Sequence, residues 1–161
     1  MNLLRCLIVF LLLLVPASAV PQTQTSDSYL CIPDQSTGFT YKGGEWQVAR
    51  FNVAEEKYVL RKRKRRERHP IYSDSRWLIF RFGETTPAGG CDKGFDRSGL
   101  IHCSYYLYGD FRMNRDTGRY QATYWPGYVD SQGAESTDAD RRAPRDGDDT
   151  PSITIGRCSA I

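Results

Sequence analysis

In several segments of the chain from Phe39 onward, apolar residues recur at every second position. A strand with one buried face has this period, whereas an amphipathic helix repeats its apolar residues every 3.6 positions. Many of the apolar residues are aromatic or β-branched, which are the types that strands favour. No segment shows a convincing helical period. The pattern therefore predicts an all-β protein.

The two clearest strand signals lie in the middle of the chain. The segment 76–82 (RWLIFRF) contains four consecutive apolar residues from Trp77 to Phe80. Apolar residues on both faces predict a central strand that is covered on both sides. The segment 109–125 predicts a hairpin, because alternating residues flank a turn in which Gly118 can adopt a positive φ.

Further strands are predicted at 46–53, 58–60, 100–108 and 153–155. In the first of these the apolar phase changes, which predicts a bulge or a bend near Ala49 and Arg50. Short strands joined by turns rich in Gly, Asp and Asn predict a single antiparallel β-barrel or sandwich of about seven to eight strands. The pattern leaves open which of the two architectures is formed.

The first nineteen residues have the composition of a secretory signal peptide. Arg5 precedes an apolar run from Cys6 to Val15, and small residues follow at Ala17 and Ala19. The run is shorter than the roughly 20 residues that a helix needs to cross a bilayer. We therefore predict cleavage near Ala19, export to the periplasm or the extracellular space, and no integral membrane segment in the remaining chain.

Residues 20–161 have the length of one exported domain. Within it, residues 20–30 are polar and aperiodic, which predicts a loose leader before the first strand. Residues 130–149 carry seven acidic and three basic side chains and show no apolar period. Such a composition predicts a mobile acidic loop.

Four cysteines follow the predicted cleavage point: Cys31, Cys91, Cys103 and Cys158. An even number in an exported protein predicts two disulfides. Three pairings are possible, and we favour the short clip Cys91–Cys103 together with Cys31–Cys158, which would join the ends of the domain. A zinc site is disfavoured because no CxxC pair occurs. No metal or other cofactor is predicted.

Charge changes the picture at one place, the segment 61–68 (RKRKRRER). This segment has a net charge of +6, while the rest of the predicted exported chain has a net charge of −4. Its cations are the candidate anion-binding residues Arg61, Lys62, Arg63, Lys64, Arg65, Arg66 and Arg68. Dense clusters of this kind bind phosphate, sulfated polymers or anionic surfaces. The segment contains no aromatic residue on which bases could stack, so sequence-specific nucleic-acid recognition is not predicted.

Two other interpretations of the basic segment stay open. It could be a strand end that projects into water, where its charges prevent strands of different molecules from pairing edge to edge. Alternatively, the acidic residues of 130–149 could neutralise it within the same molecule. In either case the cations would have no external partner.

Signals of catalysis are weak. The chain has two histidines, His69 and His102, and no G-x-S-x-G nucleophile elbow. The acidic stretch 146–149 lacks the alternating oxygen ligands and the terminal Glu of an EF-hand. No catalytic, cofactor-binding or metal-binding residue is therefore predicted, and an enzyme is the least favoured class. A cleft that gathers His102, a carboxylate and a free hydroxyl would change this ranking.

Two resemblances to known families add further expectations. The sequence Gly44-Glu-Trp46 resembles the G-x-W motif at the first strand of lipocalins. In that family the Trp closes the base of an eight-stranded barrel that holds an apolar ligand, so the resemblance implies a small-ligand-binding barrel. More of the chain, including CIPDQSTGF (31–39) and TPSITIGRCS (150–159), resembles an uncharacterised family of small exported bacterial proteins. This second resemblance implies an envelope or extracellular location and supplies no site residues.

Together these observations predict an exported, disulfide-stapled β domain that acts as a non-catalytic binding or interaction module. Its expected partner is an envelope polymer, an anionic surface or another protein. The alternative is a lipocalin-like barrel for a small ligand. An exposed Tyr/Trp patch over a filled interior would favour the first function, and an apolar cavity of several hundred Å³ would favour the second.

Overall fold

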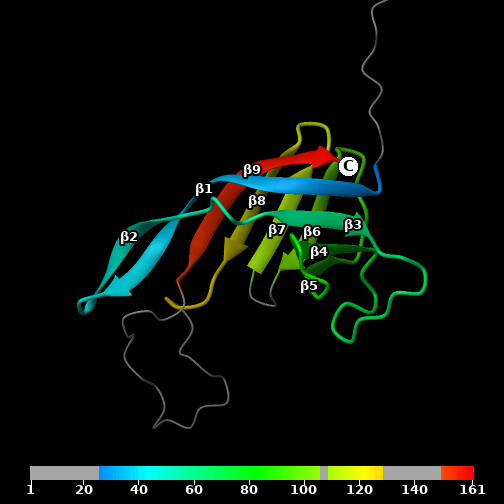
Figure 1. Cartoon of the computed structure of the whole chain (residues 1–161). Coiled ribbons are helices and arrows are strands. Elements are labelled where there is room, and N and C mark those ends of the chain that lie inside the picture. Colours follow the sequence, from blue (N-terminus) through cyan, green and yellow to red (C-terminus); the bar gives the residue numbers. More distant parts are fainter. Residues whose placement is uncertain (1–25, 106–108, 129–149) are drawn as a thin grey trace, which may run out of the picture.

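The computed structural model describes residues 26–105, 109–128 and 150–161 (Figure 1). The described residues form nine strands and no helix. The strands are β1 (Ser28–Lys42), β2 (Glu45–Phe51), β3 (Tyr58–Lys62), β4 (Trp77–Arg81), β5 (Pro87–Cys91), β6 (Leu100–Tyr105), β7 (Gly109–Asn114), β8 (Arg119–Tyr124) and β9 (Ser152–Ala160). Neighbouring strands are antiparallel. The predicted all-β, antiparallel class is confirmed.

Eight of the strands close into a barrel. Their order is β1-β3-β4-β5-β6-β7-β8-β9, and β9 pairs back onto β1 from Tyr29 to Gly38. Each of these eight strands therefore has a neighbour on both sides, which is how a closed barrel removes free edges. The ninth strand, β2, pairs with β1 outside the closed ring. Of the two predicted architectures, the chain forms the barrel.

β1 is long enough to contribute both to the barrel and to a projecting hairpin. Its last seven residues, Ser36–Lys42, pair with β2 without interruption. Gly43 and Gly44, with φ of 63° and 91°, form the two-residue turn. Positive φ at both central residues is typical of a type I′ turn, for which Gly is favoured. The β1–β2 hairpin extends away from the barrel as a two-stranded ribbon (Figure 1).

The barrel interior is filled by side chains from alternate strand positions. The buried residues of this core are Tyr29, Cys31, Tyr58, Leu60, Trp77, Ile79, Ala88, Cys91, Ile101, Cys103, Tyr105, Phe111, Met113, Tyr120, Ala122 and Cys158. Aromatic rings contact one another there, with Phe111 stacked on Tyr120 at a centroid distance of 5.1 Å. An eight-stranded barrel is just wide enough for side chains to fill it. The core of the protein therefore occupies the space where a lipocalin would hold its ligand.

Both predicted disulfides are formed, and both lie in the core. Cys31 and Cys158 face each other across the β1–β9 pair, and Cys91 and Cys103 join β5 to β6. The first bridge connects residues 127 positions apart in sequence, and the second spans 12 positions. Since β1 and β9 are the first and last strands of the barrel, the long-range disulfide links the two strands whose pairing closes it.

β4 is covered on both faces, as its apolar sequence predicts. Trp77 and Ile79 belong to the barrel core, whereas Leu78 and Phe80 form a second apolar cluster with Tyr72. Tyr72 comes from the loop 63–76 between β3 and β4. This loop therefore folds over the outer surface of β4 and is attached to it by apolar contact.

Three predictions about the first half of the chain are wrong or only partly right. The predicted leader, residues 20–30, overlaps β1, which begins at Ser28 and buries Tyr29. Of the bulge or bend predicted near Ala49 and Arg50, the bulge is absent, because β1 and β2 pair in continuous register there. Trp46, which the lipocalin resemblance implies at the base of a barrel, lies on the ribbon outside the barrel.

Two further differences concern the later strands. β5 has the sequence PAGGC and was not predicted, because it shows no apolar alternation. The predicted strand at 153–155 exists within β9, but Ile153 and Ile155 are about half exposed and Thr154 is buried instead. The two isoleucines of β9 therefore face outward, the reverse of the usual arrangement, whereas Cys158 of the same strand lies in the core.

The predicted signal peptide, residues 1–19, and the predicted acidic loop, residues 130–149, lie outside the described residues, so both stay predictions. In the part of the chain that the structure describes, no helix has the length and apolar character needed to span a membrane.

Candidate functional site

Three surface features of the described residues are candidates for function: the basic loop between β3 and β4, a cleft over β5–β7, and the β1–β2 ribbon. The charge of the basic loop predicts it as a site. The cleft contains His102, for which the sequence suggests a catalytic role only if a carboxylate and a free hydroxyl lie beside it. The ribbon was not predicted as a site. Each feature is built from different elements, so each can be considered on its own contacts.

The basic loop begins with an arginine that has a structural role. The Arg61 guanidinium donates two hydrogen bonds to the Glu67 carboxylate, at 2.8 and 2.6 Å. It also lies 4.4 Å from the centre of the Phe80 ring, in cation–π geometry. The hydrogen bonds from Arg61 lower the pKa of Glu67 to about 2. Arg61 therefore folds the loop back onto the outer face of β4 and is not available to an external anion.

The next two cations are also used within the molecule. Lys62 forms an ion pair with Asp27 at 3.3 Å. The Arg63 guanidinium donates a hydrogen bond to the backbone carbonyl of Ser73. The Arg63 backbone amide donates to the carbonyl of Arg76 at 2.9 Å, which ties the start of the loop to its end. The segment thus has a fixed base rather than being a frayed strand end.

Apolar and polar contacts anchor the far side of the loop to the barrel. The ring of His69 stacks on Tyr72 at a centroid distance of 5.2 Å, and the Tyr72 hydroxyl donates to the carbonyl of Ala88 at 3.3 Å. Ser75 is buried and donates to the carboxylate of Asp92 at 3.2 Å. A Cβ at Gly90 would collide with Ser75 and Tyr72, so glycine at this position permits the close approach of the loop.

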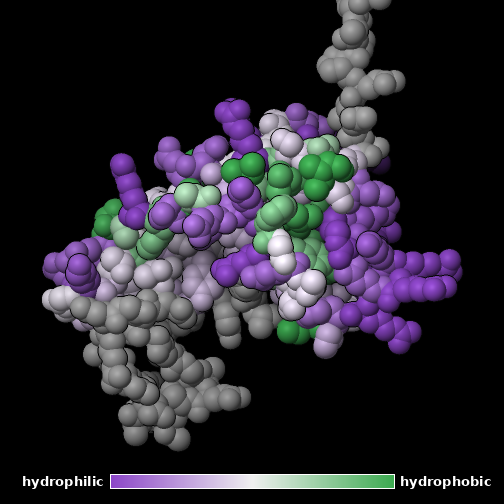
Figure 2. All heavy atoms as spheres, viewed as in Figure 1, coloured by the Kyte–Doolittle hydropathy of each residue, from purple (hydrophilic) through white to green (hydrophobic). Residues whose placement is uncertain are grey.

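The four remaining cations are Lys64, Arg65, Arg66 and Arg68, which we call the basic tip. All four are exposed, and their side chains form no hydrogen bond or ion pair with other described residues. A tight turn holds them, in which the Glu67 amide donates to the carbonyl of Lys64 at 3.0 Å. Figure 2 shows hydrophilic side chains projecting from the right-hand side of the molecule, where this loop lies in Figure 1. The predicted segment therefore divides into three structural cations and four projecting ones.

The cleft lies on the outer surface of β5–β7 and has a volume of about 430 Å³. Its lining includes His102 and Ser104 from β6 and Asp110 from β7. His102 Nε2 lies 3.1 Å from Asp110 Oδ1, and Arg112 approaches the other oxygen of this carboxylate at 3.6 Å. The structure thus gathers a histidine, a carboxylate and a serine, which sequence spacing alone could not show.

The serine of the cleft has a backbone partner. The Ser104 hydroxyl donates to the carbonyl of Gly90 at 3.3 Å, and no hydrogen bond joins it to His102. A nucleophilic serine needs a base within hydrogen-bonding distance. The condition that would favour an enzyme, a free hydroxyl beside His102, is therefore not met by Ser104. No group of three or more potential metal ligands occurs among the described residues.

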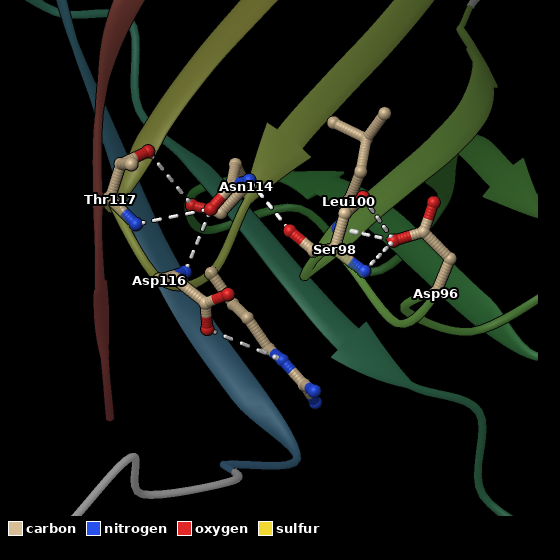
Figure 3. Close-up of polar contacts among 7 residues, drawn as sticks. Asp96, Ser98, Leu100, Asn114, Asp116 and Thr117 are labelled. Atoms are coloured by element: carbon tan, nitrogen blue, oxygen red, sulfur yellow. Dashed lines mark hydrogen bonds and ion pairs between the residues drawn. The ribbon is translucent and has the colours of Figure 1, made fainter.

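One carboxylate at the edge of the cleft is also satisfied internally (Figure 3). Asp96 accepts hydrogen bonds from the amide and hydroxyl of Ser98, at 2.9 and 2.7 Å, and from the amide of Leu100 at 2.9 Å. These bonds, the Ser98 hydroxyl first, lower the pKa of Asp96. Asn114 connects this turn to the β7–β8 turn by donating to the carbonyl of Ser98 at 3.0 Å. Asp96 therefore organises the rim of the cleft.

The β1–β2 ribbon presents an apolar face to solvent. Phe39 lies opposite Val48, and Tyr41 lies opposite Trp46, so these four side chains share one face. Val48 is 77% exposed and Phe39 is 49% exposed. Trp46 contacts Tyr41 and Tyr128 edge-on, each at a centroid distance of 5.5 Å. We call Phe39, Tyr41, Trp46 and Val48 the apolar ribbon face.

The signal for this face is visible in the sequence once the turn is known. Gly43-Gly44 is flanked on both sides by large apolar residues at every second position. That combination is the usual signature of a hairpin with one apolar face. In Figure 2, apolar atoms are visible over the ribbon at the left of the molecule.

Comparison of the chain with models of protein families, with curated proteins and with solved structures found no match.

Proposed function

We propose that this domain is a non-catalytic, exported binding module that attaches to an anionic polymer or surface through the basic tip. The proposal is based on the different roles of the cations within the basic segment. Arg61, Lys62 and Arg63 are used to hold the loop, and the basic tip projects from it without ion pairs to other residues that the structure describes. If the cations served only to prevent strands of different molecules from pairing, these contacts that hold the loop would not be needed.

Contacts that hold the loop in place before binding favour binding for a thermodynamic reason. A flexible chain that becomes ordered on binding loses conformational entropy, which reduces its affinity. Here the Arg61–Glu67 pair and the His69–Tyr72 stack hold the loop on the barrel before any partner is present. Each Lys or Arg near an anionic membrane surface contributes about 1 kcal/mol, and this attraction is screened over about 8 Å at physiological salt. Four cations can therefore support a moderate, salt-sensitive attachment.

Export is part of the proposal. Two disulfides are consistent with an oxidising compartment such as the periplasm or the extracellular space. The N-terminal pattern of residues 1–19 favours the same location. An oxidised exported domain would meet envelope polymers and lipid headgroups, which commonly carry negative charge.

The small-ligand barrel is a less favoured function. Aromatic and aliphatic side chains and both disulfides occupy the barrel interior. A ligand there would have to displace core residues such as Phe111 and Leu60, which are fully buried. The cleft over β5–β7 is open to the surface and has a polar His102–Asp110 pair, so it does not provide the apolar cavity that such a function needs.

The proposal is tested by measuring binding of the purified, oxidised protein to heparin and to vesicles that contain phosphatidylglycerol. Neutral dextran and phosphatidylcholine vesicles are the uncharged references. The test variant changes Lys64, Arg65, Arg66 and Arg68 to Ser and keeps Arg63, because Arg63 holds the loop. The matched control changes four other exposed cations to Ser: Lys57, Arg97, Arg119 and Arg157.

We expect the tip variant to lose at least about tenfold in affinity at low salt, because four surface cations are removed from the contact. The control variant has the same net charge and is expected to lose much less. Preference for heparin over vesicles would identify a polymer, and the reverse would identify a lipid surface. Equal losses in the two variants would show that only overall charge matters, and unchanged binding by the tip variant would reject the proposal.

A further inference from the structure

β2 has an unpaired edge within the described part of the chain. It hydrogen-bonds to β1 on one side, and no other described strand pairs with it. Natural proteins usually shorten, cover or charge such edges, because the exposed backbone groups pair readily with another strand. β2 is seven residues long and carries two residues of the apolar ribbon face, Trp46 and Val48. The edge is therefore suited to pairing with a further strand.

The register of the hairpin determines which backbone groups point outward. A two-residue turn closes on a hydrogen-bonded pair, here Lys42 and Glu45, and hydrogen-bonded pairs then alternate with non-hydrogen-bonded pairs. The Phe39 amide confirms this phase, because it donates to the carbonyl of Pro151 at 3.1 Å, away from β2. Its partner Val48 belongs to the same non-hydrogen-bonded pair. The outward backbone groups of β2 are therefore those of Trp46, Val48 and Arg50.

We propose that this edge pairs with β2 of a second copy of the chain, antiparallel and related by a two-fold axis at Val48. In this register Val48 lies opposite Val48 of the second copy, and Trp46 lies opposite Arg50. All three outward residues then find a backbone partner. The apolar ribbon faces of the two copies become continuous across the axis, since directly opposite residues share a face.

Side-chain chemistry favours a second copy over an unrelated strand. The proposed register places the Arg50 guanidinium beside the Trp46 ring of the other copy, which is a favourable cation–π pair, and it does so twice. No two like charges lie opposite each other. A register centred on Arg50 would oppose two arginines, and a register centred on Trp46 would leave Arg50 without a strand partner. Registers centred on Gln47 or Ala49 would pair only two of the three outward residues of each copy with β2 of the other. The register centred on Val48 is therefore the one that gives all three a strand partner.

Pairing would also remove a weakness of the isolated ribbon. A two-stranded hairpin is marginally stable in water, whereas a sheet of more strands with an apolar face is stable. Two paired ribbons form a four-stranded sheet between two barrels. This proposal does not depend on the basic tip, which lies in a different loop.

The test is the oligomeric state of the oxidised protein, measured by sedimentation from micromolar to near-millimolar concentration. We expect a monomer–dimer equilibrium in the wild type. Val48→Lys and Val48→Glu should each weaken dimerisation about tenfold or more, because like charges would lie directly opposite each other at the axis. An equimolar mixture of the two variants should form a heterodimer, since the introduced lysine of one copy would then lie opposite the introduced glutamate of the other. A matched control, Ile155→Lys, alters an exposed apolar residue of β9 outside the proposed interface and should dimerise like the wild type.

Several results would overturn the proposal. They are a wild type that stays monomeric throughout, a dimer that persists in both Val48 variants, a mixture that does not associate, or an equal loss in Ile155→Lys. Thermal unfolding distinguishes a lost interface from a lost fold. Val48 lies outside the barrel, so dilute samples of its variants should unfold at the wild-type temperature.

Discussion

At the scale of single residues, Glu67 is the residue whose ionisation maintains the shape of the basic loop. It accepts both hydrogen bonds from Arg61 and one from the amide of Lys64. The first of these contacts lowers its pKa to about 2. A pKa below the ordinary value means that the ionised form is favoured by folding. The stabilisation is present at neutral pH and is lost as the pH falls from the ordinary Glu range toward about 2.

We therefore predict that the Glu67 carboxyl titrates near pH 2 in the wild type and closer to the ordinary range in Arg61→Lys. A lysine keeps the positive charge but cannot form the two parallel hydrogen bonds. Carboxyl-detected NMR titration of Glu67 in the two proteins provides the measurement. Equal Glu67 midpoints in the two proteins would show that charge alone sets the pKa.

Tyr120 is a residue whose polar group lacks a partner in the core. Its hydroxyl is buried and has no hydrogen-bond partner among the described residues. Burial raises the pKa of Tyr120 well above its usual value. Tyr58 provides a contrast, because its hydroxyl contacts the carboxylate of Glu56 at 3.2 Å. A buried hydroxyl without a partner lowers stability, whereas one with a partner contributes modestly to it.

Tyr120→Phe should consequently leave the free energy of unfolding unchanged or raise it by up to about 1 kcal/mol. Tyr58→Phe, the matched substitution, should lower it by about 0.5–1.5 kcal/mol. Urea unfolding of the oxidised proteins gives both values. A larger loss for Tyr120→Phe than for Tyr58→Phe would mean that the Tyr120 hydroxyl has a partner in solution.

At the scale of elements, the two disulfides act on very different lengths of chain. Cys31–Cys158 closes a loop of 127 positions, and Cys91–Cys103 closes one of 12. In the chain-entropy model the first bridge contributes ~5 kcal/mol and the second ~3 kcal/mol. We predict that Cys31→Ser/Cys158→Ser destabilises the protein more than Cys91→Ser/Cys103→Ser does. Denaturant unfolding measures the ranking, and the reverse order would show that native-state contacts dominate.

The elements also show how far the sequence predicts the fold. β4 and the β7–β8 hairpin follow the usual patterns and were predicted. β5 was not predicted, because two of its five residues are glycines. Other residues approach them too closely for a larger side chain: a Cβ at Gly89 would meet the carbonyl of Ser104, and one at Gly90 would meet Ser75. Its inward and outward residues therefore cannot show an apolar alternation.

β1 and β9 were difficult for a related reason. A register shift between Pro33 and Gln35 changes the phase of β1, so no single alternation describes it. In β9 the inward positions hold Thr154, which donates to Ser36 at 2.9 Å, and Gly156, above which the ring of Tyr120 lies. The space that an apolar side chain at this position would fill is occupied by a side chain from another strand. Packing of this kind can be seen only in the three-dimensional structure.

The candidate sites were predictable to different degrees. The location of the basic segment at the end of β3 followed from the sequence. The separate roles of Arg61 and Arg65 could not be predicted from the sequence. Arg61 contacts Glu67 and the ring of Phe80, and Phe80 belongs to the next strand, β4. The cleft depends on the β6–β7 register, which brings Asp110 opposite Ser104 and beside His102. Sequence spacing alone does not specify this register.

At the scale of the whole molecule, the basic tip and the apolar ribbon face lie on different parts of the protein. The ribbon extends to one side of the barrel and the β3–β4 loop to the other (Figure 1). A protein paired through its ribbons would therefore carry two basic tips that are not part of the contact. Attachment of both tips to one polymer or surface would strengthen binding through effective concentration, without any new contact.

The position of Cys31–Cys158 also has a mechanical consequence. The bridge lies only a few residues from Ser26 and Ile161, where the Ser26 hydroxyl donates to the Ile161 carbonyl at 3.2 Å. If the domain were pulled by its two ends, tension would pass from one end to the other through the sulfur–sulfur bond. The strands between them would bear almost no load. A protein tethered in this way would keep its barrel intact under forces that separate hydrogen-bonded strands, for as long as that covalent link stays oxidised.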